Sequence, residues 1–182
     1  DIYFFSSIAG RDTSLDYDFY DRGIPGEDVD NHIRIIPNHI PAYINASSVN
    51  DYAQCLDVLA HEFTHCVTHS VMTYNAYMND YGAINEAMSD IQGNVCDLMY
   101  VDEGEGEEAD WLVGEDIGNG IRSMSDPHRY QQPEYTWDLH YVPEVRDPTE
   151  LNDRGGGHGN SSLLNYLAWQ LCTKGGMTPE EA

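Results

Sequence analysis

Two short stretches, HEFTH at residues 61–65 and NEAMSD at residues 85–90, decide the fold and the chemistry expected of this chain. His61 and His65 are four residues apart, so on an α-helix both imidazoles lie on one face and can reach one metal ion. Glu86, twenty-one residues beyond His65, supplies a carboxylate from a second predicted helix. Two His and one carboxylate leave a fourth position for water, which is typical of a catalytic zinc site. The two stretches together predict a zinc centre between two helices.

Glu62 stands beside a predicted ligand and has the chemistry of a general base. Zinc held by two neutral His and a carboxylate keeps enough positive charge to lower the pKa of its water to about 7. From position 62 a carboxylate points to the open side of the metal, where it can take the water's proton and pass it to a leaving amine. HExxH alone occurs by chance in many helices, so the second stretch makes this prediction specific.

Two residues near Glu86 are predicted to orient the ligands. Asp90 follows Glu86 by one helical turn and can accept the N–H of a ligand imidazole, which fixes the tautomer of that ring. Asn85 is a weaker candidate for the same task. An ordinary exposed aspartate is the alternative for position 90.

The periodicity of apolar residues predicts three helices, over residues 51–69, 83–100 and 160–172. The first two are expected to bury apolar stripes, made of Leu56, Leu59, Phe63 and Val67 on one helix and Ile84, Met88, Ile91, Val95 and Leu98 on the other. Residues 33–36 are a strand candidate that ends at Pro37. Residues 118–157 contain Pro, Gly, Tyr and Asp, which predicts a long connection of the kind that is usually functional.

The pairing of HEFTH with GAINEAMSD at residues 82–90 resembles the thermolysin-like neutral zinc metallopeptidases, the gluzincins. The likeness runs from about Tyr17 to the end, and residues 110–116, 121–127 and 153–161 stand in the family's order. It implies an α+β, mainly helical fold. In that fold, residues 1–50 are an edge segment of a β-rich N-terminal lobe and residues 51–182 are the helical zinc-peptidase lobe. Because TPEE at residues 178–181 is typical of a helix start, we expect the sequence to be a segment of a longer protein.

The resemblance also implies the groups that stabilise the oxyanion of a tetrahedral intermediate. His158 lies in a glycine-rich turn and corresponds to a His that the family holds by an Asp five residues earlier, here Asp153. Tyr77, nine residues before Glu86, corresponds to the second donor. The segment before Glu86 is one residue longer than usual, which leaves Tyr74 as the alternative.

Substrate-binding residues are implied in several segments. Arg122 corresponds to the residue that binds the substrate carbonyl, and Asn45-Ala46 is similar to the edge strand that pairs with the peptide main chain. The apolar wall of the primed-side pocket is implied at Val58, Val113 and Ile121. The chain departs from the family between the edge strand and the zinc helix, where only residues 47–60 intervene, and this departure bears on pocket shape and substrate range.

Calcium is implied as a second cofactor. Several carboxylates brought close together repel one another unless a hard cation joins them, and calcium prefers oxygen ligands. The acidic residues that stand where the family binds calcium are Asp57, Asp97, Asp110 and Glu115. The backbone carbonyl of Leu112 is implied as a further ligand. Solvated surface carboxylates are the alternative.

Composition limits the partners. The 182 residues, 41% of them hydrophobic, allow one domain with a core. With 32 acidic and 8 basic residues the net charge is −24, which repels nucleic acid and anionic membranes, so neither is an expected partner. No run of the sequence approaches a transmembrane span, and the composition agrees with a secreted or extracellular protein. The four Cys permit three pairings, but their places on the predicted helices suit buried thiols better.

We therefore expect a zinc metalloendopeptidase that cleaves peptides or proteins on the amino side of apolar residues. Two alternatives stay open. One is a peptidase-like binding module that is catalytically weak or inactive, against which the intact Glu62 argues. The other is a zinc hydrolase that acts on non-peptide amides with the same metal chemistry.

Overall fold

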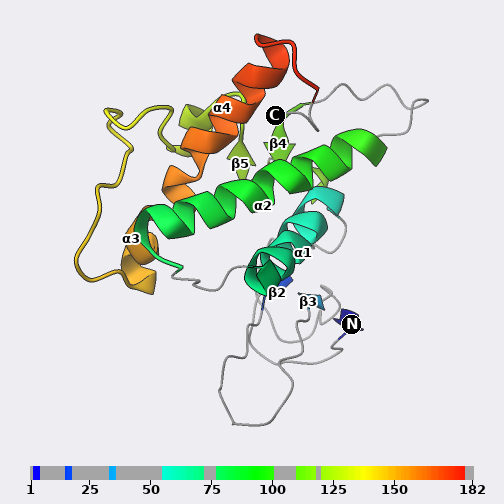
Figure 1. Cartoon of the computed structure of the whole chain (residues 1–182), viewed down its shortest axis with the longest axis horizontal. Coiled ribbons are helices and arrows are strands. Elements are labelled where there is room, and N and C mark those ends of the chain that lie inside the picture. The colour runs from blue at the N-terminus through cyan, green and yellow to red at the C-terminus, as the bar shows by residue number, and fades with distance from the viewer. Residues whose placement is uncertain are drawn as a thin grey trace.

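Two helices that cross each other, α1 (Leu56–Val71) and α2 (Asn79–Tyr100), form the centre of the structure (Figure 1). The structure is a computed structural model that describes residues 2–4, 15–17, 33–35, 55–71, 77–100, 110–117 and 120–178. α3 (Asp153–Asn160) and α4 (Ser162–Thr173) both pack against α2. The fold is α+β and mainly helical, as predicted.

Two small sheets accompany the helices. β4 (Leu112–Val113) pairs antiparallel with β5 (Arg122–Ser123), and Val113 lies opposite Arg122. β4 contacts α2 and β5 contacts α4, so this hairpin brings Arg122 to the centre of the molecule. Three short 3₁₀ helices complete this part, η2 (Glu115–Ile117), η3 (Pro127–Tyr130) and η4 (Glu150–Asn152).

The second sheet has the strand order β1-β3-β2 and comes from the N-terminal part of the chain. β1 (Ile2–Phe4) pairs in parallel with β3 (Ile33–Ile35), and β2 (Leu15–Tyr17) pairs antiparallel with it. β2 and β3 contact α1. The strand predicted at residues 33–36 is confirmed as β3. The other residues of the predicted segment 1–50 lie outside the described residues, and the domain division at residue 50 stays a prediction.

Gly93 allows α1 and α2 to approach closely. A Cβ atom at this position would lie 2.4 Å from the carbonyl oxygen of Asp57 and 3.4 Å from the backbone nitrogen of His61. The first distance is too short for any real contact, so a larger residue would push the helices apart. Ala83, Ala87 and Ser89 are also buried on α2. Small side chains on α2 therefore bring its backbone close enough for side chains of both helices to meet at one point.

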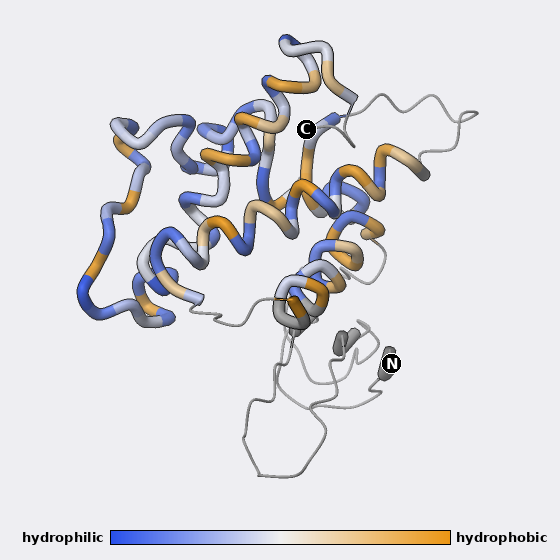
Figure 2. Tube along the Cα trace, in the orientation of Figure 1, coloured by the Kyte–Doolittle hydropathy of each residue, from blue (hydrophilic) through white to orange (hydrophobic). Residues whose placement is uncertain are grey.

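The buried faces of α1 and α2 differ from the prediction. Phe63 and Val67 of α1 are 60% and 45% exposed, and Ile84 and Met88 of α2 are 50% and 44% exposed. The residues buried between the helices are mostly polar, and they include His61, His65, Asn85, Glu86, Ser89 and Asp90. Apolar and polar residues alternate along both helices (Figure 2). The apolar period identified the helices. The predicted stripes are buried only in part, at half-buried Leu59, Ile91, Val95 and Leu98, because the polar site occupies the interface.

The element boundaries also differ in places. The first helix was expected to begin at residue 51. Cys55 is not helical, and α1 begins at Leu56. α2 begins four residues before the predicted start, at Asn79, while α4 matches its predicted range within two residues. The predicted connection over residues 118–157 contains β5, η3, η4 and the start of α3, so its irregular part is shorter than expected. None of the described helices combines the length and apolar character that crossing a membrane requires.

Candidate active site

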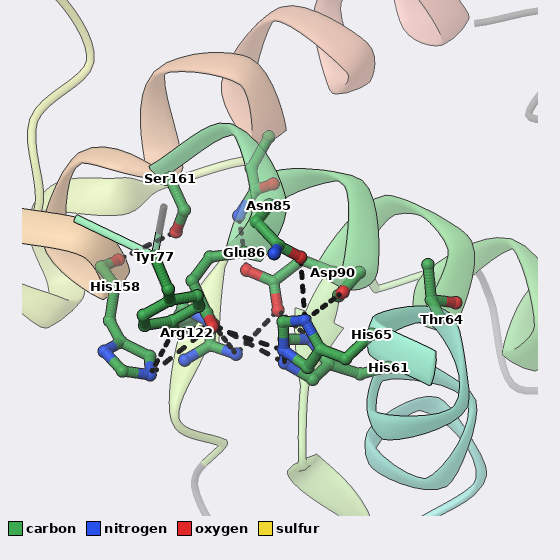
Figure 3. Close-up of polar contacts among 12 residues, drawn as sticks. His61, Thr64, His65, Tyr77, Asn85, Glu86, Asp90, Arg122, His158 and Ser161 are labelled. Atoms are coloured by element: carbon green, nitrogen blue, oxygen red, sulfur yellow. Dashed lines mark hydrogen bonds and ion pairs between the residues drawn. The ribbon is translucent and has the colours of Figure 1, made fainter. Parts of the chain in front are cut away.

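His61 and His65 of α1 meet Glu86 of α2 in a buried cluster (Figure 3). The Nε2 atoms of the two imidazoles are 3.0 Å apart. Glu86 Oε1 lies 3.2 Å from His65 Nε2, and Glu86 Oε2 lies 3.5 Å from His61 Nε2. The structure thus brings together the three side chains predicted as zinc ligands, and their donor atoms face one another.

The partners of the two Nδ1 atoms decide what the cluster can hold. His65 Nδ1 donates to Asn85 Oδ1 at 2.8 Å, and His61 Nδ1 lies 2.8 Å from Asp90 Oδ1. An acceptor beside each Nδ1 favours the tautomer protonated there, which leaves a lone pair on each Nε2. Two such lone pairs and a carboxylate directed at one point repel one another unless a cation lies between them. Asn85 and Asp90 therefore occupy the orienting positions that the sequence suggested.

Glu86 gives a further test of whether zinc fits. Its Oε2 atom is buried and, among the described residues, has no hydrogen-bond partner. Burial raises the pKa of this carboxyl, but His65, His61 and His158 outweigh burial and hold the pKa well below its usual range. An ionised, buried oxygen without a hydrogen bond is costly, and a metal ion would satisfy it. Two His and one carboxylate are a known donor set for catalytic zinc, so these residues fit zinc.

Asp90 is the centre of a second buried network. Arg122 Nη2 donates to Asp90 Oδ1 at 2.6 Å, and Asn165 Nδ2 donates to Asp90 Oδ2 at 2.8 Å. Burial raises the pKa of Asp90, but Arg122 and His61 outweigh it and set the pKa at about 2. The ionised carboxylate can therefore orient His61. Arg122 itself is buried, and its Nη2 lies 4.0 Å from Glu86 Oε2, so the predicted substrate-binding residue stands beside the metal cluster.

Tyr77 and His158 adjoin the cluster from another side. The Tyr77 hydroxyl donates to Glu86 Oε1 and lies 3.4 Å from His158 Nε2, which is itself 3.5 Å from Glu86 Oε2. His158 Nδ1 donates to Asp153 Oδ1 at 2.5 Å. The contact with Asp153 raises the pKa of His158, against its burial, and Glu86 adds to the increase. Burial and Glu86 raise the pKa of Tyr77 far above its usual range, so the phenol stays protonated and can donate.

Glu62 follows His61 on α1 and is half-buried. Burial raises the pKa of its carboxyl, while the charges of His61 and His65 lower it, and the net shift is upward. A carboxylate whose pKa is raised accepts a proton more readily at neutral pH. The electrostatics of Glu62 therefore suit the predicted general base.

The structure describes some of the other residues predicted to bind substrate. Val58 and Val113 are buried, Ile121 is half-buried, and the Ile121 N–H donates to the Val113 carbonyl at 2.7 Å. The β4–β5 hairpin thus brings Val113 and Ile121 together. Asn45, Ala46 and the alternative Tyr74 lie outside the described residues.

Acidic residues gather at a second place, although in a different combination from the predicted one. Asp97 and Glu115 form a close group with Asp116, which was not among the predicted ligands. Burial and the charges of Asp57, Asp110 and Asp97 raise the pKa of Glu115 to about 7, despite an opposing backbone hydrogen bond. Within the described structure its Oε2 atom is buried without a hydrogen-bond partner. This arrangement suits a bound cation.

The other predicted calcium ligands have protein partners. Asp57 accepts hydrogen bonds from the backbone N–H groups of Val58 and Gly114, at 2.7 and 2.5 Å. It stands close to Cys55 and Asp116. The Leu112 carbonyl accepts from Asn94 Nδ2 at 3.0 Å, and Asp110 is exposed, with Oδ1 accepting from the Leu112 N–H. The structure therefore does not gather all five predicted groups around one point.

Asn165, Ser89 and Asp116 belong to these sites and were not predicted. Asn165 reaches Asp90 from 75 residues away, and Ser89 Oγ lies 3.1 Å from His65 Nδ1. Ser89 is adjacent to Asp90 in the second motif and four residues beyond Asn85 on one helix, a spacing that signals a shared face. No local spacing connects Asn165 with Asp90.

A model of the family described as "Thermolysin metallopeptidase, alpha-helical domain" matches residues 75–182. The chain belongs to this thermolysin metallopeptidase family. Thermolysin from Alicyclobacillus acidocaldarius is 40% identical over 131 residues, which cover 67% of this chain and 21% of that protein. A zinc metalloproteinase from Renibacterium salmoninarum is 39% identical over 120 residues, covering 65% of this chain and 22% of that protein. The thermolysin-family chain thus spans about a fifth of the length of these relatives.

A solved structure agrees with this assignment. The precursor of protealysin, a metalloproteinase from Serratia proteamaculans, is similar with a TM-score of 0.52 and 30% sequence identity. The similarity covers 68% of the thermolysin-family chain and 40% of the protealysin chain. Family and mainly helical fold are therefore established, and membership of a metallopeptidase family implies dependence on zinc.

Proposed function

We propose that this thermolysin-family chain forms the catalytic part of a zinc-dependent endopeptidase, which hydrolyses peptide bonds on the amino side of apolar residues. The observation that carries the proposal is the buried cluster of His61, His65 and Glu86, whose donor atoms converge and in which Glu86 Oε2 has no hydrogen-bond partner among the described residues. Family membership supports the reaction class. The substrate is a peptide or a protein.

His61, His65 and Glu86 would hold the zinc ion, with Asp90 and Asn85 fixing the two imidazoles. A bound zinc ion would act as the Lewis acid that polarises the scissile carbonyl and acidifies water. Glu62 takes a proton from the attacking water and delivers it to the leaving amine, a task for which its raised pKa suits it. This order of events needs no proton acceptor other than Glu62.

His158 and Tyr77 act on the developing oxyanion. Both present polar atoms toward Glu86, on the same side of the cluster. The pKa of each group is raised, which favours its protonated form, and the protonated form can donate a hydrogen bond. Donors placed where negative charge develops stabilise the transition state more than the ground state. Asp153 keeps the His158 ring in position through its contact with Nδ1.

Arg122 and the β4–β5 hairpin line the proposed substrate site. Arg122 Nη2 lies 4.0 Å from Glu86 Oε2, which places the guanidinium beside the metal cluster, where it would bind a substrate carbonyl. Val58, Val113 and Ile121 would form an apolar wall for the side chain that follows the scissile bond. We assign Asn45 and Ala46 to main-chain recognition on the grounds of sequence alone.

Calcium is proposed as a structural cofactor at Asp97, Glu115 and Asp116, with Asp57, Asp110 and Leu112 in its neighbourhood. We also propose that the protein acts outside the cell, in line with its acidic composition and its family. Residues 51–182 would make up the helical peptidase lobe, and residues 1–50 would belong to the β-rich lobe that precedes it.

One assay separates this function from a binding module that lacks turnover. The chain is incubated with an unstructured protein substrate after zinc loading, after treatment with a zinc chelator, and after zinc is restored. The proposal predicts hydrolysis in the first and third samples, with new N-termini at apolar residues. Zinc-loaded protein that binds the substrate and leaves it intact would contradict the proposal.

A further inference from the structure

Arg154 occupies a backbone conformation that arginine rarely adopts. Asp153, Arg154, Gly155 and Gly156 have φ angles of 53°, 50°, 89° and 83°, so four consecutive residues form a left-handed turn before His158. Glycine adopts this conformation freely, whereas a residue with a Cβ atom is strained there. Asp153 is needed in the turn because it holds His158. Strained residues cluster at functional sites and persist only where the surrounding structure holds them, which directs attention to the contacts of Arg154.

The guanidinium of Arg154 lies over the aromatic ring of Tyr77, with Cζ 5.3 Å from the ring centroid. Its Nε donates to Glu150 Oε1 at 3.0 Å, and its Nη2 donates to the same oxygen. The backbone N–H of Arg154 donates to the Thr149 carbonyl at 2.7 Å. The carboxylate of Glu150 thus holds the cation above the ring, while the Thr149 carbonyl holds the backbone of Arg154. A planar guanidinium on the face of a phenol is an attractive cation–π contact.

A purely structural role accounts poorly for this arrangement. The side chains of Arg154 and Glu150 are 45% and 78% exposed, and exposed ion pairs contribute little to stability. Glycine at position 154 would relieve the strain of the turn, so stability alone does not favour arginine. The contact with Tyr77 is different, because the Tyr77 hydroxyl reaches Glu86 and lies near His158.

We propose that Arg154 is a positioning residue for Tyr77. Its guanidinium holds the phenol ring in the orientation that directs the hydroxyl at the oxyanion, and it places a positive charge behind that donor. This inference rests on the proposed peptidase function. Arg154 acts through Tyr77 and does not touch the substrate.

The test measures kcat, KM, zinc content and melting temperature for the zinc-loaded chain and its variants. Arg154→Met removes the cation, Arg154→Lys keeps a positive charge, and Arg154→Gly relieves the backbone strain. We expect Arg154→Met to lower kcat by about threefold to thirtyfold, with KM and zinc content little changed. Arg154→Lys should recover part of the loss. Arg154→Gly should lower kcat without lowering the melting temperature.

Two comparisons distinguish a role through Tyr77 from a general effect of charge. In a Tyr77→Phe background, which keeps the ring and removes the hydroxyl, Arg154→Met should produce no further loss of kcat. The matched control is Arg129→Met, because exposed Arg129 also lies over a ring, that of Tyr130 at 5.4 Å. This control should leave kcat unchanged.

The inference is overturned if Arg154→Met leaves kcat unchanged, lowers it equally in both Tyr77 backgrounds, or removes zinc. The same holds if Arg129→Met reproduces the loss. In each case the starting protein still hydrolyses peptides, and the peptidase proposal stands. A zinc-loaded starting protein without peptide turnover would instead overturn the peptidase proposal, and this inference with it.

Discussion

At the scale of single residues, the carboxylate of Asp90 on α2 connects side chains from three other elements of the candidate site. It lies against His61 on α1, accepts from Arg122 on β5 and accepts from Asn165 on α4. A buried carboxylate is tolerated here because a cation and an amide satisfy its two oxygens. The consequence is that the orientation of the His61 ring depends on two elements other than α1 and α2.

His158 provides a prediction about the pH dependence of activity. The protonated ring is the form that stabilises an oxyanion, so kcat should fall as pH rises through the raised pKa of His158. Asp153→Asn removes the carboxylate that raises this pKa, and the alkaline limb of the kcat profile should move to lower pH. Profiles of the two proteins, recorded over the same buffers, test this shift. An alkaline limb that stays in place would assign it to another group.

The loss of the ring itself should be larger. His158→Ala is expected to lower kcat by roughly 10²–10³-fold, because the interaction is made mainly in the transition state. Zinc content and KM should change little, and both are measured on the same preparation. If zinc disappears together with activity, His158 is a ligand or a structural residue instead.

The structure brings together the candidate site residues whose sequence signals are local. His61, His65, Asn85, Glu86 and Asp90 lie on two helices at spacings that define a common face, and the structure brings them together. Asn165 could not be predicted, because only the packing of α4 on α2 brings it to Asp90. Asp116 was missed because acidic residues near Glu115 are abundant and carry no periodic signal.

At the scale of elements, the geometry of the site depends on the close crossing of α1 and α2. Gly93→Ala would place a methyl group against the Asp57 carbonyl and push the helices apart, so we expect a loss of about 1–3 kcal/mol in unfolding free energy. Zinc affinity should fall as well, because the ligands come from both helices. Urea denaturation and a zinc competition titration measure the two effects.

Gly82→Ala is the matched control on the same helix. A Cβ atom there would have its nearest contacts at 3.5 and 3.6 Å, which is ordinary van der Waals distance. Stability should stay the same or rise, because alanine favours a helix more than glycine. If both variants behave alike, the close approach at Gly93 is not what limits the helix packing.

The connection between η3 and η4 is held by two asparagines that pair with backbone groups. Asn79 exchanges two hydrogen bonds with Val145, and Asn160 exchanges two with Val142. Asn79→Gly suits the positive φ of 50° at this position and removes only the side-chain bonds. We expect a loss of about 1–3 kcal/mol and faster proteolysis within residues 131–149. Unchanged cleavage in that segment would show that Asn79 does not anchor it.

The existence of the helices was predictable, but the face that each helix buries was predictable only in part. The apolar period at residues 56–67 and 84–98 marked both helices, yet Phe63, Ile84 and Met88 proved exposed. The rule that apolar faces are buried fails when a polar site fills the interface between two helices. The long predicted connection contained short elements whose signals are too weak to read from sequence.

At the scale of the whole molecule, a net charge of −24 makes the folded state sensitive to cations. Asp97, Glu115 and Asp116 concentrate part of this charge at one place. A cation that binds only the folded chain adds about 2.7 kcal/mol at a hundredfold excess over its Kd, so millimolar calcium should raise the melting temperature. Magnesium should do less, since it prefers a tighter octahedral shell.

Two variants locate the effect. Glu115→Gln should reduce the calcium-dependent rise in melting temperature, whereas Asp147→Asn, at an exposed position outside the cluster, should preserve it. Thermal melts over a calcium titration of metal-stripped protein measure both. Equal responses from the two variants would indicate general charge screening instead of a site.

The central claim, that this chain is a zinc peptidase with Glu62 as its base, is tested most directly by measuring zinc content and peptide turnover together on Glu62→Gln and on the unchanged chain. We expect about one zinc per chain in both proteins, with kcat at least roughly 10²-fold lower in the variant, because the base is lost and the ligands remain. Turnover at the normal rate in Glu62→Gln, or loss of its zinc, would contradict the account.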